Sequence, residues 1–465
     1  MTIRLGSPYA FNCRRRADRM ALRPQPQVRA KRPTVRIVHT SDWHLGISTG
    51  HVSRLRDQER FLEWLTALLA ERAVDALVVA GDVFDTAQPS SEALALYFRF
   101  LAGIRSTGVR NVVVVGGNHD SPARLDAPRD VLAGLDVHVV GGLWRAPGDA
   151  RDLDAMIVPL RTRGSDDIEG ACLAVPYVHE YHLGIRTSDD DPTAVRNAFR
   201  ASFRALYDGL VRGARERFGQ LPLVATGHLT LGRGATRDDY PQAIHQVGTI
   251  EALPTDILPD DIAYVALGHI HRAYRVGGSC AWYSGTPVPY SVVESKTPRH
   301  VLVVDIGEDG GVAVEMVPVP VERRIERLVG TADEVVERLA SLSWSTPSPP
   351  LLHVEVHGLE GDVGLPRRLD EALAQHPDHA RPCIVEVRQI AKAEREASQD
   401  EPERKPLAAL RPEEVFERLC DLEGIEGDER AVLVRAFSSL ASRQSDDDGH
   451  AFEAPPKAQG EEQAP

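Results

Sequence analysis

Cysteine is scarce in this chain, and its pattern excludes two common kinds of stabilising site. The five cysteines are far apart, odd in number and free of any CxxC spacing: Cys13, Cys172, Cys280, Cys383 and Cys420. A disulfide framework or a structural zinc finger would need closely spaced pairs, so we expect neither, and the pattern favours a reducing compartment. The 465 residues suffice for roughly two or three domains with sizeable cores.

Long apolar runs and an excess of positive charge are also missing. No stretch of about 18 apolar residues occurs, so we expect no transmembrane helix. The arginine-rich N-terminal segment lacks the apolar run of a signal peptide, which predicts a cytoplasmic protein. The net charge is −14, whereas a nucleic-acid-binding protein usually has a basic surface. Contact with DNA would therefore need a local basic patch or bound cations.

Charge and apolar periodicity divide the chain into six segments. Between 34 and 300, amphipathic helices alternate with apolar strands, which predicts an α/β domain with strands at 35–38, 75–80, 111–115, 223–226 and 262–267. Residues 301–391 begin with a hairpin pattern over 301–317 and predict a smaller α/β domain. The other segments are a disordered basic extension at 1–33, a charged linker at 392–406, two short helices within 407–442 and a disordered acidic tail at 443–465.

Five short segments place Asp, Asn or His directly after a predicted strand. They are Asp42-Trp43-His44, Gly81-Asp82, Gly117-Asn118-His119-Asp120, Gly227-His228 and Gly268-His269-Ile270-His271. Ligands of α/β sheets bind at the carboxyl ends of the strands, so we expect these side chains to meet. One Gly-Asp or Gly-His pair alone is common in turns, whereas all five in this order are strong evidence for a functional site.

The residue types in these segments suit a pair of divalent cations. Hydrolysis of a phosphodiester requires stabilisation of charge on the attacking and the leaving oxygen, which two cations about 3.5–4 Å apart provide. Such a site needs mixed oxygen and nitrogen ligands and one bridging carboxylate. Imidazole with carboxylate and without thiolate suits manganese, iron or zinc better than calcium. The segments therefore predict a metal-dependent phosphoesterase.

The order DxH, GD, GNHD, GH, GHxH resembles that of the calcineurin-like metallophosphoesterases. Longer stretches are similar to the bacterial SbcD nuclease subunits: HTSDWHLG (39–46), GDVFDT (81–86), GNHDSPARL (117–125), GHIH (268–271) and SGTPVPYS (284–291). The resemblance implies an α/β fold, a four-layer αββα sandwich at 34–300, with residues 301–391 as a small DNA-binding cap. It covers the nuclease core and, more loosely, the segments after 301.

The resemblance also implies a role for each matching side chain. Asp42, His44 and His271 would hold one metal ion, Asn118, His228 and His269 would hold the other, and Asp82 would bridge the two. His119 would face the scissile phosphate, stabilise its charge or protonate the leaving oxygen. Manganese (Mn²⁺) would be the working metal.

Two further residues are candidates on less specific grounds. Archaeal and eukaryotic relatives place a histidine three residues after the bridging carboxylate, where this chain has Asp85. Asp85 is therefore either a second acid–base group or a carboxylate that orients a ligand. Arg124 follows GNHDSP and is a candidate contact of the DNA backbone, with a surface ion pair as the alternative.

Four other positions near these segments favour structural explanations. His39 precedes Asp42 within a strand, which predicts a buried, hydrogen-bonded histidine. Trp43 could stack on a base, but packing beneath the metal loop is the favoured interpretation. His179 and His182 have metal-like spacing without further ligands close in the sequence, which predicts a surface loop.

The resemblance implies a nucleoid-associated DNA-repair nuclease, with exonuclease action on double-stranded ends and endonuclease action on hairpins and single strands. It also implies a partner, the SbcC ATPase, and the lack of a GxxxxGK[ST] motif here fits that division of labour. The helices within 407–442 would dock on this partner. The helices at 53–72 and 90–105 would form a homodimer face or only core. Two alternatives stay open: a phosphatase of small phosphate esters, and a non-catalytic scaffold that binds DNA and the ATPase.

Overall fold

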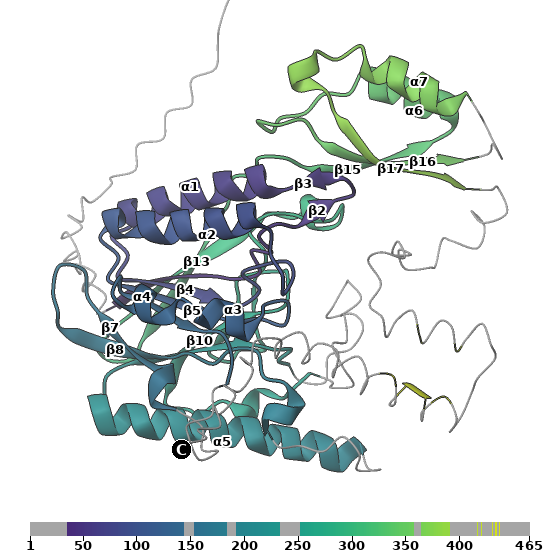
Figure 1. Ribbon diagram of the computed structural model, residues 1–465. Coiled ribbons are helices and arrows are strands. Elements are labelled where there is room, and N and C mark those ends of the chain that lie inside the picture. The colour runs from purple at the N-terminus through teal and green to yellow at the C-terminus, as the bar shows by residue number, and fades with distance from the viewer. Residues whose placement is uncertain are drawn as a thin grey trace, which may run out of the picture. The chain divides into compact units, whose positions relative to one another are not determined.

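The chain is described here from a computed structural model (Figure 1). The structure describes residues 35–143, 153–183, 192–232, 252–357 and 364–390, together with six positions between 416 and 437. The extension at 1–33, the linker at 392–406, the tail at 443–465 and most of the segment at 407–442 lie outside the described residues.

A six-stranded mixed sheet is built around β1, β4, β5 and β6, which run parallel to one another. In spatial order its strands are β14 (Val312–Pro318), β13 (His300–Ile306), β1 (Val35–Thr40), β4 (Ala76–Ala80), β5 (Asn111–Val115) and β6 (Val137–Val140). The apolar runs that predicted β1, β4 and β5 are buried on both faces, as expected for central parallel strands.

The hairpin expected over 301–317 is present, and its strands belong to this first sheet. β13 pairs antiparallel with β1, with Ile37 opposite Val304, and β14 pairs antiparallel with β13. The first sheet therefore extends to Pro318, past the domain boundary expected at 301. The alternating pattern of a hairpin is the same whether it stands alone or extends another sheet, so the sequence did not distinguish the two.

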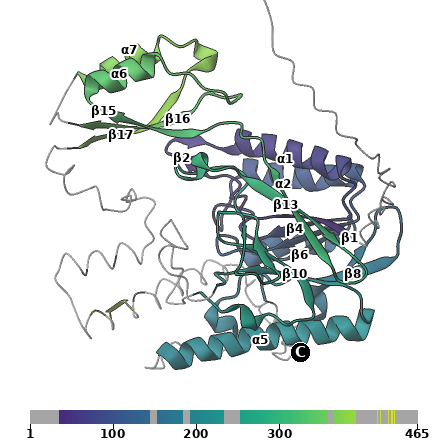
Figure 2. The same cartoon turned by 180° about the vertical axis from the view of Figure 1, so that it is seen from behind.

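A second six-stranded mixed sheet faces the first (Figure 1, Figure 2). In spatial order its strands are β11 (Tyr274–Arg275), β12 (Ala281–Tyr283), β10 (Ile262–Gly268), β9 (Leu223–His228), β8 (Ile168–Leu173) and β7 (Ile157–Arg161). The four central strands run parallel, and β7 and β11 are antiparallel edges. The strands predicted near 223 and 262 are thereby confirmed.

Helices cover the outer faces of the two sheets. α1 (Leu55–Glu71) and α2 (Ser91–Ile104) share one hydrophobic cluster with β1, β4 and β5. α5 (Pro192–Phe218) packs with the second sheet in another cluster, which also fills the space between the sheets. The short helices are α3 (Pro122–Asp126), α4 (Arg129–Ala133) and the 3-10 turns η1 (Arg105–Thr107), η2 (Asp154–Met156), η3 (Glu180–Leu183), η4 (Thr255–Ile257), η5 (Glu294–Lys296) and η6 (Asp378–Ala380). β2 (Ser48–Thr49) and β3 (Val52–Ser53) form a small ribbon.

A small parallel sheet follows β14. Its strands are β15 (Ile325–Gly330), β16 (Leu351–His357) and β17 (Cys383–Ile390), and α6 (Ala332–Ala340) and α7 (Leu365–Leu373) pack on it. α6 begins with a capping box, in which the Thr331 hydroxyl accepts from Glu334 N and the Glu334 carboxylate accepts from Thr331 N.

Two findings concern the remaining segments. The six described positions between 416 and 437 are helical, and Phe416 stacks on Phe437 with ring centroids 4.3 Å apart. Within the described part of the chain, no helix combines the length and the apolar character that crossing a membrane requires.

Candidate metal centre

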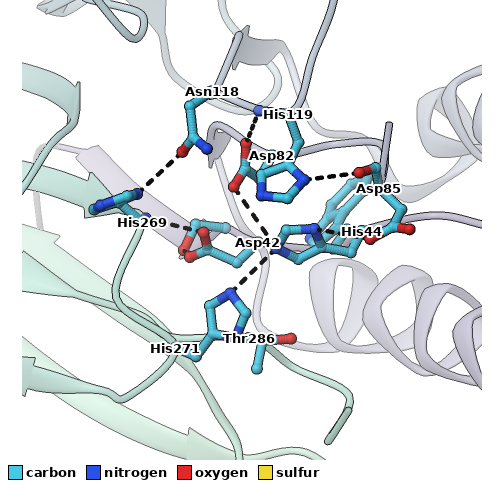
Figure 3. A network of polar contacts seen from close by, with 12 residues as sticks. Asp42, His44, Asp82, Asp85, Asn118, His119, His269, His271 and Thr286 are labelled. Atoms are coloured by element: carbon cyan, nitrogen blue, oxygen red, sulfur yellow. Dashed lines mark hydrogen bonds and ion pairs between the residues drawn. The ribbon is translucent and has the colours of Figure 1, made fainter. Parts of the chain in front are cut away.

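The five predicted segments converge between the ends of the two sheets (Figure 3). Asp42 and His44 follow β1, Asp82 follows β4, and Asn118 and His119 follow β5, all in the first sheet. The second sheet contributes His228 at the end of β9, and His269 and His271 after β10. The expectation that these side chains meet is confirmed, because the carboxyl ends of parallel strands lie at one edge of each sheet.

The backbone at this edge adopts unusual conformations. Asp42, His44, Asp82 and His269 have positive φ angles of 53°, 45°, 49° and 95°. Non-glycine residues rarely occupy this region, and such strain persists only where the surrounding structure holds it. Here Asp42 N donates to Gly81 O and His44 N donates to Asp82 O, both at 3.0 Å, so that the two loops fix each other.

Asp82 lies in the middle of the cluster. Its Oδ2 is 3.3 Å from His228 Nε2 and 3.6 Å from His44 Nε2, and its Oδ1 accepts a hydrogen bond of 2.9 Å from His119 N. Asp82 is almost completely buried. One carboxylate thus faces imidazoles from both sheets, which is the placement that a bridging ligand requires.

The other predicted ligands form a group on each side of Asp82. On one side, His44 Nε2 and His271 Nε2 are 3.1 Å apart, and Asp42 lies close enough to share a metal ion with them. On the other side, Asn118 Oδ1 is 3.1 Å from His228 Nε2 and 3.0 Å from His269 Nδ1. These two groups contain the residues that the resemblance assigns to the two ions, and the assignment stays a prediction.

Hydrogen bonds set which ring nitrogen faces the centre. Nδ1 of His228 donates to Ala80 O at 2.9 Å, and Nδ1 of His271 donates to the Glu294 carboxylate at 2.8 Å. Nδ1 of His119 donates to the backbone carbonyl of Asp85 at 2.7 Å. When such a ring is neutral, its one proton is committed in this way, so Nε2 can offer a lone pair to a cation.

The buried charges shift one another's pKa values. Burial opposes ionisation of Asp82, but His228 and the neighbouring imidazoles lower the pKa of this carboxyl well below its usual range. Burial opposes protonation of His228, but Asp82 raises the pKa of this imidazole to about 9. Likewise, burial opposes protonation of His271, and its hydrogen bond to Glu294 raises its pKa to about 9. A cation that binds here must therefore displace protons.

The donor set fits divalent cations. Three overlapping groups have ligand atoms within 4.8 Å of one another: Asp42 with His44 and His271, His44 with Asp82 and His119, and Asp42 with Asp82 and His228. The carboxylates of Asp42 and Asp82 are buried, which is costly unless positive charge compensates them. Two ring nitrogens that face each other at 3.1 Å also suit a shared cation, and the mixed oxygen and nitrogen set agrees with the predicted chemistry.

The weaker candidates lie at the margin of the cluster. Asp85 Oδ1 is 3.6 Å from His44 Nδ1, so its carboxylate lies beside a predicted ligand. Arg124 is exposed on α3, outside the cluster. His119 lies within ligand range of His44 and Asp82, so distance alone does not separate a catalytic role from a ligand role.

Burial and contacts agree with the structural explanations given for His39, Trp43 and His179, whereas His182 is half-buried in η3. His39 is buried, and its Nδ1 is 2.8 Å from Tyr264 Oη. Trp43 is buried against Phe61 and Phe100, and its indole N–H donates to Thr40 Oγ1. His179 is exposed in a loop after β8.

Sequence reasoning missed three supporting residues. Asp120, in the GNHD segment but given no role, accepts hydrogen bonds from Val83 N, Phe84 N and Gly117 N and so ties two ligand loops together. Glu294 orients His271, and Gln58 on α1 contacts the loop that carries His44. Asp120 could have been found by its place in the motif, whereas Glu294 and Gln58 have no local signal.

A Gly117→Ala substitution should damage the centre. A Cβ at Gly117 would lie 2.1 Å from Asp82 Oδ1 and 2.2 Å from Asp82 N, so the backbone would have to move. We expect Mn²⁺ affinity to fall about 10-fold or more, as when a metal ligand loses its support. Gly103→Ala on α2 is the control, because nothing lies within 4 Å of its Cβ and alanine favours a helix. Equal metal affinity in the two variants, measured by calorimetry, would contradict this account.

Comparisons with known proteins agree with the geometry. The model of the calcineurin-like phosphoesterase family matches residues 35–273, and a model described as the type 5 capsule protein repressor C-terminal domain matches residues 321–423. The chain is 35% identical over 383 residues to the SbcD subunit of the SbcCD nuclease of Rhodobacter capsulatus, covering 78% of this chain and 93% of the relative. It is 32% identical over 410 residues to the corresponding SbcCD subunit of Escherichia coli K12, covering 87% and 97%. For the corresponding protein of Bacillus subtilis 168, the identity is 31% over 274 residues, covering 58% and 66%.

Proposed function

The chain belongs to the SbcD nuclease subunits of the calcineurin-like phosphoesterases, and we propose that it hydrolyses DNA phosphodiester bonds at a two-metal centre. The observation that carries the proposal is the position of Asp82, whose carboxylate lies between His44 of the first sheet and His228 of the second. The layers seen in the core, helices on the outer face of each of two facing sheets, support the predicted αββα sandwich.

The side chains divide the work as follows. Asp42, His44 and His271 would hold one ion, Asn118, His228 and His269 would hold the other, and Asp82 would be shared by the two. When bound, two divalent cations, in our proposal Mn²⁺, would polarise the phosphodiester and lower the pKa of a water molecule. The Nδ1–H of His119 is committed to Asp85 O, so Nε2 is free to exchange a proton with the leaving oxygen or to stabilise phosphate charge. Asp85 orients His44, and Arg124 is a candidate contact of the DNA backbone.

The partners follow from the named relatives, which belong to an SbcCD nuclease. We propose that this chain works with an SbcC ATPase, which would dock on the helices within 407–442, and that it acts on DNA ends, hairpins and single strands. A homodimer through α1 and α2 and a cytoplasmic, nucleoid-associated location complete the proposal. The small sheet at 325–390 would serve as the cap beside the DNA.

Metal affinity should rise with pH up to about 9. His228 and His271 have pKa values of about 9 in the metal-free chain, so at pH 7 both are protonated. Each must release its proton to bind a cation, and protons therefore compete with Mn²⁺ below pH 9 and no longer do so above it. Calorimetric titrations at pH 7 in buffers of different ionisation enthalpy should show net proton release. A binding enthalpy that is the same in all buffers would contradict this prediction.

The test of function compares DNA with small phosphate esters. Cleavage of linear duplex DNA and hairpins by the purified chain with Mn²⁺ is measured with and without the ATPase partner and ATP, and nucleotides should be turned over far more slowly than DNA is cut. Robust cutting of duplex ends that never requires the partner would contradict the expected role of the ATPase. Faster hydrolysis of small esters than of any DNA would favour the alternative phosphatase. Binding of DNA without cleavage under all of these conditions would favour the scaffold.

A further inference from the structure

Gln58 connects helix α1 to the loop that carries His44. Its Nε2 donates to the backbone carbonyls of His44 at 2.7 Å and of Trp43 at 3.2 Å, and its Oε1 accepts from Gly46 N at 3.0 Å. The Gln58 side chain is buried, and His44 has a left-handed backbone with φ of 45°. A single amide group therefore contacts the loop at His44 and on both sides of it, and this loop carries His44 to the metal centre.

Tyr290 lies beside Gln58 and contacts the same loop. Its hydroxyl donates to the backbone carbonyl of Trp43 and accepts from Gln58 Nε2 at 3.0 Å. Its ring packs edge-on against the His44 ring, with centroids 5.9 Å apart. Tyr290 thus supports His44 through both the loop backbone and the imidazole.

Glu294 holds the second histidine of the same group. One carboxylate oxygen accepts from His271 Nδ1 at 2.8 Å, and the other accepts from the backbone N–H groups of Tyr290 at 2.7 Å and Ser291 at 3.0 Å. Arg299 donates to the backbone carbonyl of His271 at 2.9 Å. Tyr290 therefore links the contacts of the two histidines. Its hydroxyl contacts the loop that carries His44, and its backbone N–H donates to the carboxylate that orients His271.

We propose that Gln58, Tyr290 and Glu294 form one positioning network that sets the affinity of the metal site made by Asp42, His44 and His271. The inference rests on the proposed two-metal function. The other group has separate anchors, because His228 Nδ1 donates to Ala80 O on the central strand β4. Removing the network should therefore weaken one of the two sites and spare the other.

The selective effect follows from how ligands are held. A histidine whose partner is lost can rotate or change tautomer, so that its nitrogen no longer faces the ion, and such losses weaken metal binding about 10–100-fold. His44 and His271 face each other at 3.1 Å, so displacement of either changes the same ion position. Metal binding that is weakened in this way is restored at higher metal concentration. Activity that is lost with a catalytic group is not restored by added metal.

The test uses the full chain and three substitutions that keep side-chain size: Gln58→Met, Tyr290→Phe and Glu294→Gln. Glu63→Gln is the control, since Glu63 is exposed on α1 and pairs only with Arg60 in the described contacts. Mn²⁺ binding is measured by calorimetry, DNA cleavage is measured against Mn²⁺ concentration, and thermal melts check folding. Tyr290→Phe removes only a hydroxyl, so it keeps the test informative if another variant folds poorly.

We expect the wild type and Glu63→Gln to bind two ions. Each network variant should bind one ion as the wild type does and the other about 10–100-fold more weakly, with kcat restored by excess Mn²⁺. Equal weakening of both sites, or unchanged affinity at both, would overturn the network while the two-metal function stands. A wild-type chain that binds fewer than two ions would instead overturn the proposed function.

Discussion

Replacing His119 with alanine should slow DNA cleavage by about 10²–10⁴-fold while two metal ions still bind. Burial lowers the pKa of His119, although the negative charge of Asp82 has the opposite effect. The uncharged form of the ring is therefore favoured, and its Nδ1–H donates to Asp85 O. The His119 ring lies edge-on to that of His44, with centroids 4.8 Å apart, so His119 is adjacent to a proposed metal ligand. Loss of an acid–base group at this place removes transition-state stabilisation without removing a cation.

Metal stoichiometry decides what a loss of activity in this variant means. His119→Ala and a control, His179→Ala, an exposed histidine, are compared for Mn²⁺ binding and for single-turnover cleavage. Two bound ions with slow cleavage would agree with the catalytic role. If the variant bound only one ion, His119 would be a ligand, as its distance to His44 and Asp82 permits. Wild-type cleavage by the variant would remove the mechanism.

Asp82→Asn should weaken both metal sites and abolish cleavage. The substitution keeps the size of the side chain and removes the negative charge that lies between His44 and His228. Breaking a buried charge pair costs about 3–5 kcal/mol, and the same carboxylate contributes to two cations. We therefore expect Mn²⁺ affinity to fall by about 10²–10³-fold at both sites. Asp305→Asn is the matched control, because Asp305 pairs with Arg36 at a partly exposed position.

The Asp82→Asn substitution should also change the pKa of His228 in the absence of metal ions. Asp82 raises the pKa of His228 to about 9 against the opposing effect of burial. With asparagine at 82, burial continues to lower the pKa of His228 and only the smaller effects of Asp42 and the Ala80 carbonyl still raise it, so the pKa of His228 should fall. Titration of the histidine resonances by NMR measures this shift. A pKa for His228 that stays near 9 in Asp82→Asn would show that another group holds its charge.

The predicted metal ligands could be read from the sequence because they lie in short segments that directly follow predicted strands. Four of the five apolar runs end at a Gly-Asp, Gly-Asn or Gly-His step, and the first ends at Ser41-Asp42. The ends of parallel strands lie together, so Asp82 and His228 meet although they are 146 positions apart. The family order of the segments then distributed the ligands between two ions. Asp82, Asn118 and His271 each lie close to another predicted ligand, and their distribution between two ions stays a prediction.

The supporting residues could not be read in this way. Gln58 is one polar residue in an amphipathic helix, and its contact with Tyr290 spans 232 positions. Glu294 follows the SGTPVPYS stretch in a short turn, where a glutamate usually faces solvent, and only its distance to His271 shows its role. The pairing of β13 with β1 was hidden for a similar reason, because strand partners far apart in sequence leave no local pattern.

Anomalous diffraction from crystals grown with Mn²⁺ would test the central claim most directly. The account predicts two peaks about 3.5–4 Å apart, one on each side of Asp82. One peak should contact Asp42, His44 and His271, and the other should contact Asn118, His228 and His269. A single peak, or peaks that leave Asp82 without a metal contact, would contradict it.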